Sequence, residues 1–235
     1  MKKRIITILI AILVLSALFT GCGGGSGLGG EKLNVDTDVI QLQKPQKGDK
    51  IATIETSEGT IKVLLFEKYA PKAVFNFVTL AENGYYDNTV FHRTVENFCI
   101  QGGSPDGTAT GGTSCWGLEF EDEFSDNLHH YNGALSMANH GDDTNGSQFF
   151  FVTSPLADLD EDAEESMKDN GWKKSVVDAY KDAGGLPQLD YRYTVFGQIY
   201  DGLNVAYKIS RSETDKNERP VKDITVVSVT IEAVE

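Results

Sequence analysis

Short runs of β-type residues, with hydrophobic and polar positions intermixed, make up much of the chain after about residue 50. Two such runs, residues 51–56 and 60–66, lie on either side of the turn Ser57-Glu58-Gly59, which predicts a pair of strands joined by a turn. Further runs predict strands at residues 98–101, 134–138, 148–153, 194–200 and 224–232. The pattern favours a mainly β domain. A closed barrel is the expected arrangement, although the pattern alone does not fix it.

Two segments of this domain have helical rather than strand-like spacing. The first begins near Pro71, which suits the first turn of a helix. Its apolar positions recur on one face, and Gly84 is suited to end it; these apolar positions are Val74, Phe77, Val78 and Ala81. A second, shorter helix is predicted at residues 203–210.

The first residues do not belong to the predicted domain. A basic start, Met1-Lys2-Lys3-Arg4, precedes an apolar run at residues 5–19. About 20 residues are needed to span a bilayer, so this run suits a secretory signal peptide better than a membrane helix. Residues 18–22 resemble a bacterial lipobox, which implies a signal peptide at 1–21 and lipidation of Cys22. An ordinary signal peptide with a chance cysteine is the alternative.

A linker is expected between Cys22 and the domain. Residues 23–30 are rich in Gly and Ser, and residues 31–50 are polar without clear periodicity. Residues 22–50 therefore predict a flexible tether, which would span about 30 Å as a random coil. The folded domain is expected at residues 51–235.

The charge of the chain limits its partners. Its formal net charge is −14, and loss of residues 1–21 would remove three positive charges and no acids, which gives −17. An acidic body argues against nucleic acid and against electrostatic docking on anionic lipid. Membrane attachment is expected through acyl chains instead. Cys99 and Cys115 are either two separate thiols, the favoured alternative, or a disulfide that export would permit.

One group of residues carries the strongest functional signal. Arginine, amides and phenylalanines recur among glycine-rich turns at residues 91–93, 98–103, 137–139 and 145–151, without a Ser/His/Asp set or a phosphate loop. This combination resembles the cyclophilin family of peptidyl-prolyl cis/trans isomerases, over about residues 51–235. The resemblance implies a closed, eight-stranded antiparallel barrel capped by two helices. It also implies a reaction that needs no cofactor and no metal, with proline-containing polypeptides as partners.

The resemblance assigns roles to individual residues. Arg93 matches the catalytic arginine of the family, and His92 beside it is interpreted as orienting or structural. Cys99 and Tyr193 stand at pocket positions where many members have methionine and histidine. The remaining matches form the proline pocket (Phe98, Phe150 and Leu189) and the positions that hold the peptide or brace the arginine (Gln101, Ala138, Asn139 and Gln148). Without the resemblance, the pocket residues would more often be plain core, and Arg93 a surface or ion-paired residue.

The chain departs from the family pattern at about residues 156–187. This insertion contains nine acids and four lysines. Apolar positions from Ala163 to Tyr180 have roughly helical spacing, and Gly184-Gly185 would end the helix. The acids from Asp158 to Asp169 alternate as in a calcium loop but lack its glycine and final glutamate, so an acidic helix start is favoured. The histidines, including His129 and His130, lack the spacing of a zinc site.

The sequence thus predicts a monomeric, extracytoplasmic isomerase of X–Pro bonds that assists the folding of exported proteins. Two alternatives stay open. The same groove could bind proline segments as a chaperone-like module with little turnover, or the barrel could be a structural spacer in a lipoprotein.

Overall fold

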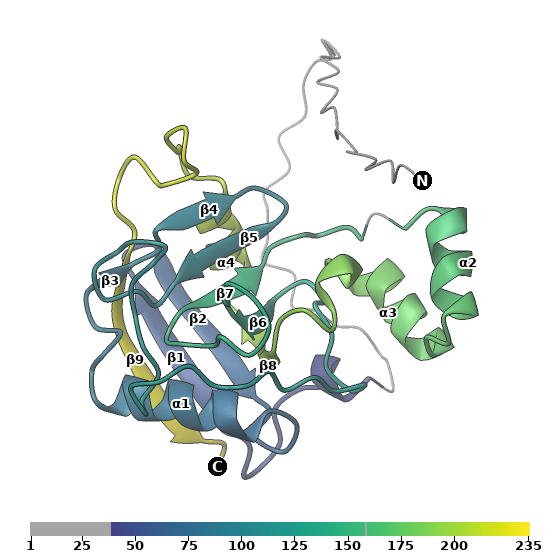
Figure 1. Ribbon diagram of the computed structural model, residues 1–235, viewed down its shortest axis with the longest axis horizontal. Coiled ribbons are helices and arrows are strands. Elements are labelled where there is room, and N and C mark those ends of the chain that lie inside the picture. The colour runs from purple at the N-terminus through teal and green to yellow at the C-terminus, as the bar shows by residue number, and fades with distance from the viewer. Residues whose placement is uncertain (1–38, 158) are drawn as a thin grey trace, which may run out of the picture.

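The computed structural model of the chain describes residues 39–157 and 159–235 (Figure 1). The predicted signal peptide, Cys22 and most of the predicted linker lie outside the described residues. Within the described part of the chain, no helix has both the length and the apolar character needed to cross a bilayer.

Strands dominate the described structure, which confirms the mainly β fold. They form one curled antiparallel sheet of nine strands in the order β3-β9-β1-β2-β8-β6-β7-β5-β4. Their bounds are β1 (Lys50–Thr56), β2 (Gly59–Leu65), β3 (Thr89–Val90), β4 (Arg93–Val95), β5 (Cys99–Gly102), β6 (Ala134–Met137), β7 (Phe149–Val152), β8 (Val195–Asp201) and β9 (Thr225–Ala233). The strand pair predicted around Ser57-Glu58-Gly59 is β1–β2, with Thr56 paired to Gly59 at its end.

The sheet has nine strands rather than the expected eight because one stretch of chain is divided at Phe91 and His92. The backbone amides of these two neighbouring residues donate to different parts of the sheet. The Phe91 amide donates to Ile224 O, just before β9, at 2.9 Å, and the His92 amide donates to Gln101 O of β5 at 3.0 Å. Strand β3 therefore pairs with β9 and strand β4 with β5. The two edges of the curled sheet are therefore consecutive parts of one segment, and Arg93 is the first residue of β4.

Two helices pack against the sheet, as expected. Helix α1 (Pro71–Glu82) lies against β9 and β8, whereas α4 (Leu203–Ser210) lies against β2, β4 and β5. The first turn of α1 contains Pro71, and its buried face includes Val74, Phe77 and Ala81. Asn83 is the C-cap, and Gly84 follows it with φ +69°. The expected helix end is thus displaced by one residue.

Residues 39–50, which the sequence assigns to the linker, pack against the domain. The short 3-10 helix η1 (Ile40–Leu42) places the Gln41 side chain in the interior. Its amide donates to His129 O at 2.8 Å and to Gln198 Oε1 at 2.9 Å, and it accepts from the His129 amide at 2.7 Å. A buried amide with all these partners holds the segment in place.

The insertion contains two helices where the sequence predicts one. Helix α2 (Glu161–Asp169) and helix α3 (Lys174–Ala183) are separated by Asn170, the C-cap of α2, and by Gly171, whose φ is +82°. A left-handed glycine at this position ends a helix. Figure 1 shows both helices on one side of the sheet. Their buried residues pack with Val39, Leu42 and Tyr131 in a cluster separate from the barrel core.

Candidate active site

The register of three strands places the predicted site residues in one row. Arg93 on β4 is opposite Gln101 on β5, which is opposite Phe150 on β7. Residues directly opposite each other in an antiparallel sheet share a face. Because side chains alternate between faces, the neighbouring residues of these strands point into the barrel core; these are Ile100, Phe149 and Phe151. The strand order thus brings together residues 57 positions apart along the chain.

Arg93 is half-buried and makes three contacts through its guanidinium. Its Nε donates to Glu218 Oε2 at 2.6 Å, and its Nη1 is 3.5 Å from Cys99 Sγ. Its Cζ lies 5.6 Å from the centroid of the Phe98 ring, which is within cation–π distance. Within the described residues Nη2 has no hydrogen-bond partner, so a donor remains available beside the pocket.

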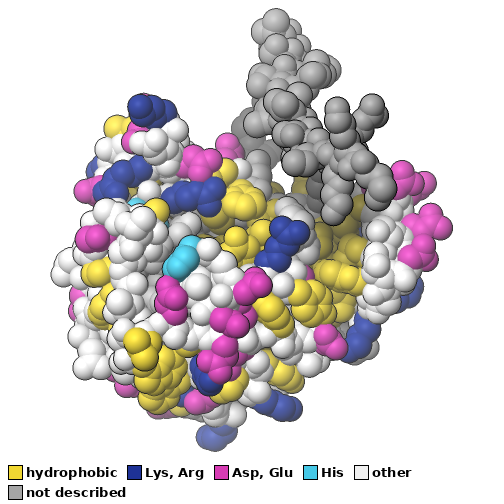
Figure 2. Space-filling model, in the orientation of Figure 1, with side chains coloured by type: hydrophobic (Ala, Val, Ile, Leu, Met, Phe, Trp, Pro, Cys, Tyr) yellow, Lys and Arg dark blue, Asp and Glu magenta, His cyan; other side chains and the backbone are white. Residues whose placement is uncertain are grey.

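The predicted proline-pocket residues form one hydrophobic cluster. Phe150 and Tyr193 contact edge to face with their ring centroids 5.4 Å apart, and His130 stacks on Phe150 at 6.0 Å. The cluster contains buried Cys99 and Phe150 together with the partly buried Phe98, Ala138, Leu189 and Tyr193. Figure 2 shows a hydrophobic area near β5 and β7 with basic side chains at its edge. The structure therefore joins residues from four parts of the chain into one apolar surface next to Arg93.

The predicted peptide-holding residues line a groove with a volume of about 620 Å³ beside this cluster. Gln101 donates to Gln148 Oε1 at 2.9 Å, and Gln148 donates to Gly111 O at 2.7 Å and Ala109 O at 2.9 Å. On the other wall, Asn139 donates to Arg192 O at 3.1 Å. Gln101, Ala138, Asn139 and Gln148 all line the groove. These side chains are fixed by neighbouring loops before any peptide binds.

His92 is buried behind Arg93. Neither of its ring nitrogens has a hydrogen-bond partner among the described residues. Burial, and then the positive charge of Arg219, lowers the pKa of His92 to about 4. The ring is therefore neutral near pH 7, which agrees with a structural or orienting role.

The cysteines of the domain are separate thiols. Cys99 is buried in the pocket and Cys115 is partly buried, and neither forms a disulfide. Burial raises the pKa of Cys99 to about 11. Cys99 is therefore a neutral side chain, and it is smaller than the methionine that many members of the family have at this position.

Asp190 is a buried residue of the site that the sequence analysis did not single out. It accepts hydrogen bonds from His129 Nδ1 and His130 Nδ1, each at 2.7 Å, and from the Tyr180 hydroxyl at 2.8 Å. Burial by itself would raise the pKa of Asp190, but the hydrogen bonds from the two histidines outweigh it and lower the pKa to about 2. This carboxylate joins the insertion to the residue that stacks on Phe150. One feature of the sequence could have identified Asp190: it directly follows Leu189, a residue of the predicted proline pocket.

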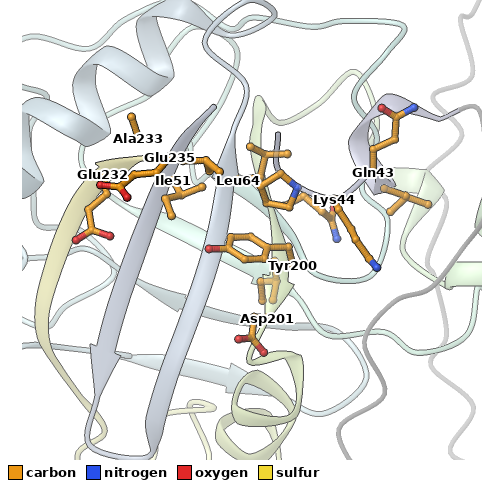
Figure 3. A pocket seen from close by; sticks show the side chains of 14 residues that line it. Gln43, Lys44, Ile51, Leu64, Tyr200, Asp201, Glu232, Ala233 and Glu235 are labelled. Atoms are coloured by element: carbon orange, nitrogen blue, oxygen red, sulfur yellow. The ribbon is translucent and has the colours of Figure 1, made fainter. Parts of the chain in front are cut away.

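Another cavity, of about 520 Å³, lies elsewhere on the domain (Figure 3). Side chains such as Leu64 and Tyr200 line it together with Gln43 and Lys44 of the N-terminal segment. None of the predicted site residues lines this cavity. The candidate site is therefore the groove beside Arg93.

The acidic residues at the start of the insertion make contacts within its own two helices. Asp160 is the N-cap of α2, and its Oδ1 accepts from the Ala163 amide at 2.8 Å. Glu164 pairs with Lys168 of the same helix and with Lys181 of α3. These contacts agree with the acidic helix start that the sequence favours over a calcium loop.

Comparisons with known proteins agree with this site. The family model described as cyclophilin type peptidyl-prolyl cis-trans isomerase matches residues 51–231. A peptidyl-prolyl cis-trans isomerase of Staphylococcus aureus strain USA300 is 44% identical over 193 residues, which cover 82% of this chain and 97% of that protein. A Staphylococcus epidermidis protein of the same name is 41% identical over 197 residues, covering 83% of this chain and 99% of that protein.

Solved structures of cyclophilins are also similar to this chain. A cyclophilin type peptidyl-prolyl cis-trans isomerase of Cryptosporidium parvum matches with a TM-score of 0.65 and 33% identity, covering 80% of this chain and 99% of that chain. A structure of the same protein in the presence of the dipeptide Ala-Pro matches with a TM-score of 0.63 and 33% identity, covering 78% of this chain and 99% of that chain. This chain belongs to the cyclophilin family and is a peptidyl-prolyl cis/trans isomerase.

Proposed function

We propose that Arg93 is the catalytic residue of this isomerase and that the cluster around Phe150 binds the substrate proline. Rotation about an X–Pro bond is slow because the nitrogen lone pair is delocalised into the carbonyl, with a barrier of about 18–20 kcal/mol. The lone pair becomes available only when the amide twists. A donor aimed at the proline nitrogen therefore stabilises the transition state more than either planar state.

The position of the guanidinium carries this proposal. Arg93 Cζ lies 5.6 Å from the Phe98 ring at the edge of the apolar cluster. A guanidinium stays charged at every relevant pH, and a water-poor surface strengthens its interaction with the twisted amide. Proton transfer is not required, which fits a neutral His92.

The groove beside the cluster would hold the peptide backbone around the proline. Asn139 and Gln101 carry both donors and acceptors, which suits an extended peptide. Gln148 links Gln101 to the loop at residues 109–111. We expect this chain of amides to fix the substrate so that the X–Pro bond lies against the guanidinium.

Replacement of Arg93 tests the catalytic role. Arg93→Ala should lower kcat by about 100-fold or more, because one charged donor to a developing lone pair is lost. The measurement is proline exchange in a short Ala-Pro-Phe peptide by NMR, with the full chain in detergent micelles. Arg211 offers a matched control: it also pairs with a glutamate, Glu96, and lies over a ring, that of Tyr207. Arg211→Ala should leave exchange unchanged.

Three outcomes are distinguishable in this experiment. Loss of exchange in folded Arg93→Ala, with exchange retained in Arg211→Ala, supports the catalytic role. Retained exchange in Arg93→Ala contradicts it. Peptide shifts without faster exchange in the unaltered chain would instead favour a proline-binding module.

The cellular setting proposed here is extracytoplasmic, with the chain anchored by a lipid on Cys22 and acting as a monomer on exported polypeptides. The basic start, the apolar run at 5–19 and Cys22 at its end support this proposal. Radiolabelled palmitate should enter the unaltered chain and not Cys22→Ala, and the unlabelled variant should leave the membrane fraction. Labelling of Cys22→Ala would contradict the assignment. Light scattering of the purified protein tests the monomer.

A further inference from the structure

Glu218 is the residue that pairs with Arg93, and it comes from a distant part of the chain. Arg93 Nε donates to Glu218 Oε2 at 2.6 Å, across 125 positions of sequence. A guanidinium has five N–H donors. The carboxylate takes only Nε, and Nη1 lies 3.5 Å from Cys99 Sγ, on the side of the pocket. The pair therefore fixes the plane of the guanidinium without occupying the donors that face the substrate site.

The loop that carries Glu218 is held against the site by its backbone. Glu218 O accepts from the Thr94 amide at 2.9 Å, next to Arg93 itself. Within the loop, Asp215 Oδ1 accepts from the amides of Asn217 at 2.8 Å and Arg219 at 3.1 Å. Arg219 Nη1 then donates to Gly107 O at 2.5 Å. The loop is thus attached to β4 on one side and to the segment after β5 on the other.

The backbone of Glu218 has an unusual conformation. Its φ is +62°, in the left-handed region that favours glycine and asparagine. A glutamate gains nothing in such a turn from its own conformational preference. Its side chain, in contrast, reaches Arg93. The turn therefore places a carboxylate at a fixed point beside the guanidinium.

We propose that Glu218 is a positioning residue for Arg93. It holds the guanidinium plane through Nε, so that the N–H groups of Nη1 face the pocket that receives the substrate proline. This inference rests on the catalytic role proposed above for Arg93. It acts through the hydrogen bond rather than through the negative charge, because the carboxylate is half-exposed to solvent and its charge is screened.

The two contributions can be separated by two substitutions. Glu218→Ala removes both the hydrogen bond and the charge, whereas Glu218→Gln keeps an oxygen that can accept from Nε. The backbone contact with Thr94 does not depend on either side chain. Glu96→Ala is a matched control, since Glu96 pairs with Arg211 at 3.1 Å in the same manner and does not touch Arg93.

The experiment measures kcat and KM separately by proline exchange in the same peptide, with the full chain and these variants. We expect Glu218→Ala to lower kcat about 5- to 10-fold, because an arginine that is free to move must be oriented in each turnover. KM should change less than about twofold, since the peptide-holding amides are untouched. Glu218→Gln and Glu96→Ala should stay within about twofold of the parent in both constants.

A direct readout accompanies the kinetics. The Nε proton of Arg93 should exchange slowly with water in the parent and in Glu218→Gln, and rapidly in Glu218→Ala. A purely structural role would not produce this pattern together with a fall in kcat. In an Arg93→Ala background, Glu218→Ala should have no further effect on kcat.

Three other results would each contradict a different part of the proposal. An unchanged or raised kcat in Glu218→Ala overturns the positioning role. An equal loss in Glu218→Gln and Glu218→Ala overturns the hydrogen-bond basis in favour of charge. If Arg93→Ala itself keeps full activity, the catalytic role of Arg93 fails, which is distinguishable from a failure of Glu218 alone.

Discussion

Two apolar clusters on this molecule are built in opposite ways. The pocket cluster joins Cys99 and Phe150, which strand register places, to Leu189 and Tyr193 from the segment before β8. The insertion cluster packs the faces of α2 and α3 against Val39, Leu42 and Tyr131. The first presents a partly open surface beside Arg93, whereas the second is largely closed. The difference fits the proline-binding role proposed for the first cluster, whereas the second attaches an extra element to the domain.

The two clusters meet at a single buried carboxylate. Asp190 accepts from Tyr180 of the insertion cluster and from His130, which stacks on Phe150 of the pocket cluster. Polar junctions of this kind are strong only when every partner is satisfied. We therefore expect changes at Asp190 to affect both clusters, and changes within the insertion to leave the pocket largely intact.

The largest effect on stability is expected from Asp190→Ala. This change leaves the N–H groups of His129 and His130 and the Tyr180 hydroxyl without their acceptor in a dry environment. The free energy of unfolding should fall by about 3–5 kcal/mol. Urea unfolding measures this value, and the melting temperature should fall by about 10 °C. A loss below about 1 kcal/mol would contradict the role of Asp190 as the link between the two clusters, since an ordinary exposed ion pair contributes that much.

His92 should make the protein sensitive to acid. Its pKa is about 4 in the folded protein and about 6.5 in the unfolded chain. Between these values the unfolded chain binds a proton that the folded protein does not, so stability falls as the pH falls from 6.5 towards 4. The fall is at most about 3 kcal/mol.

Comparison with His92→Gln isolates this effect. Urea unfolding at pH 7, 5.5 and 4.5 should show a smaller loss of stability on acidification in the variant than in the parent. Other buried groups titrate in both proteins and cancel in the difference. Equal pH dependence in the two proteins would show that His92 is not kept neutral by the fold.

The sequence predicted the features of this molecule that depend on neighbouring residues better than those that depend on contacts between distant parts of the chain. Local patterns located most of the strands, α1 and α4, and the family motif identified Arg93, Gln101 and Phe150 before the register placed them in one row. The single helix predicted in the insertion was wrong, because Gly171 divides it into two.

Residues that act through distant side-chain contacts could not be predicted in this way. Glu218 lies in a polar loop, and nothing near it in sequence indicates Arg93 as a partner. Gln41 lies in a segment of linker composition, yet its amide is buried between His129 and Gln198. Both roles depend on pairings that appear only when the strands are assembled.

Two neighbouring tyrosines provide a sharper test of the junction. The rings of Tyr131 and Tyr180 are 4.6 Å apart in the insertion cluster, and both are fully buried. The Tyr180 hydroxyl donates to Asp190, whereas the Tyr131 hydroxyl has no partner among the described residues. Tyr180→Phe should therefore cost about 1.5 kcal/mol or more, and Tyr131→Phe should be neutral or slightly stabilising. Equal losses in the two variants, measured by urea unfolding, would show that packing alone determines stability there.

The smallest effect on catalysis is expected from removal of the insertion. Residues 156–183, which contain both of its helices, begin and end at adjacent points: a Cβ placed on Gly184 would lie 2.5 Å from the carbonyl carbon of Pro155. A short glycine linker can therefore replace residues 156–183. The free energy of unfolding should fall, because Tyr131 and Leu42 lose the residues of α2 and α3 that pack against them. Turnover of a short peptide should nevertheless stay within about threefold of the parent, a change of less than about 1 kcal/mol, because Arg93 and Phe150 are held by the register of β4, β5 and β7. Loss of turnover in a variant whose NMR spectrum retains the barrel signals would make the insertion part of the active site, and the two clusters would then be one functional unit.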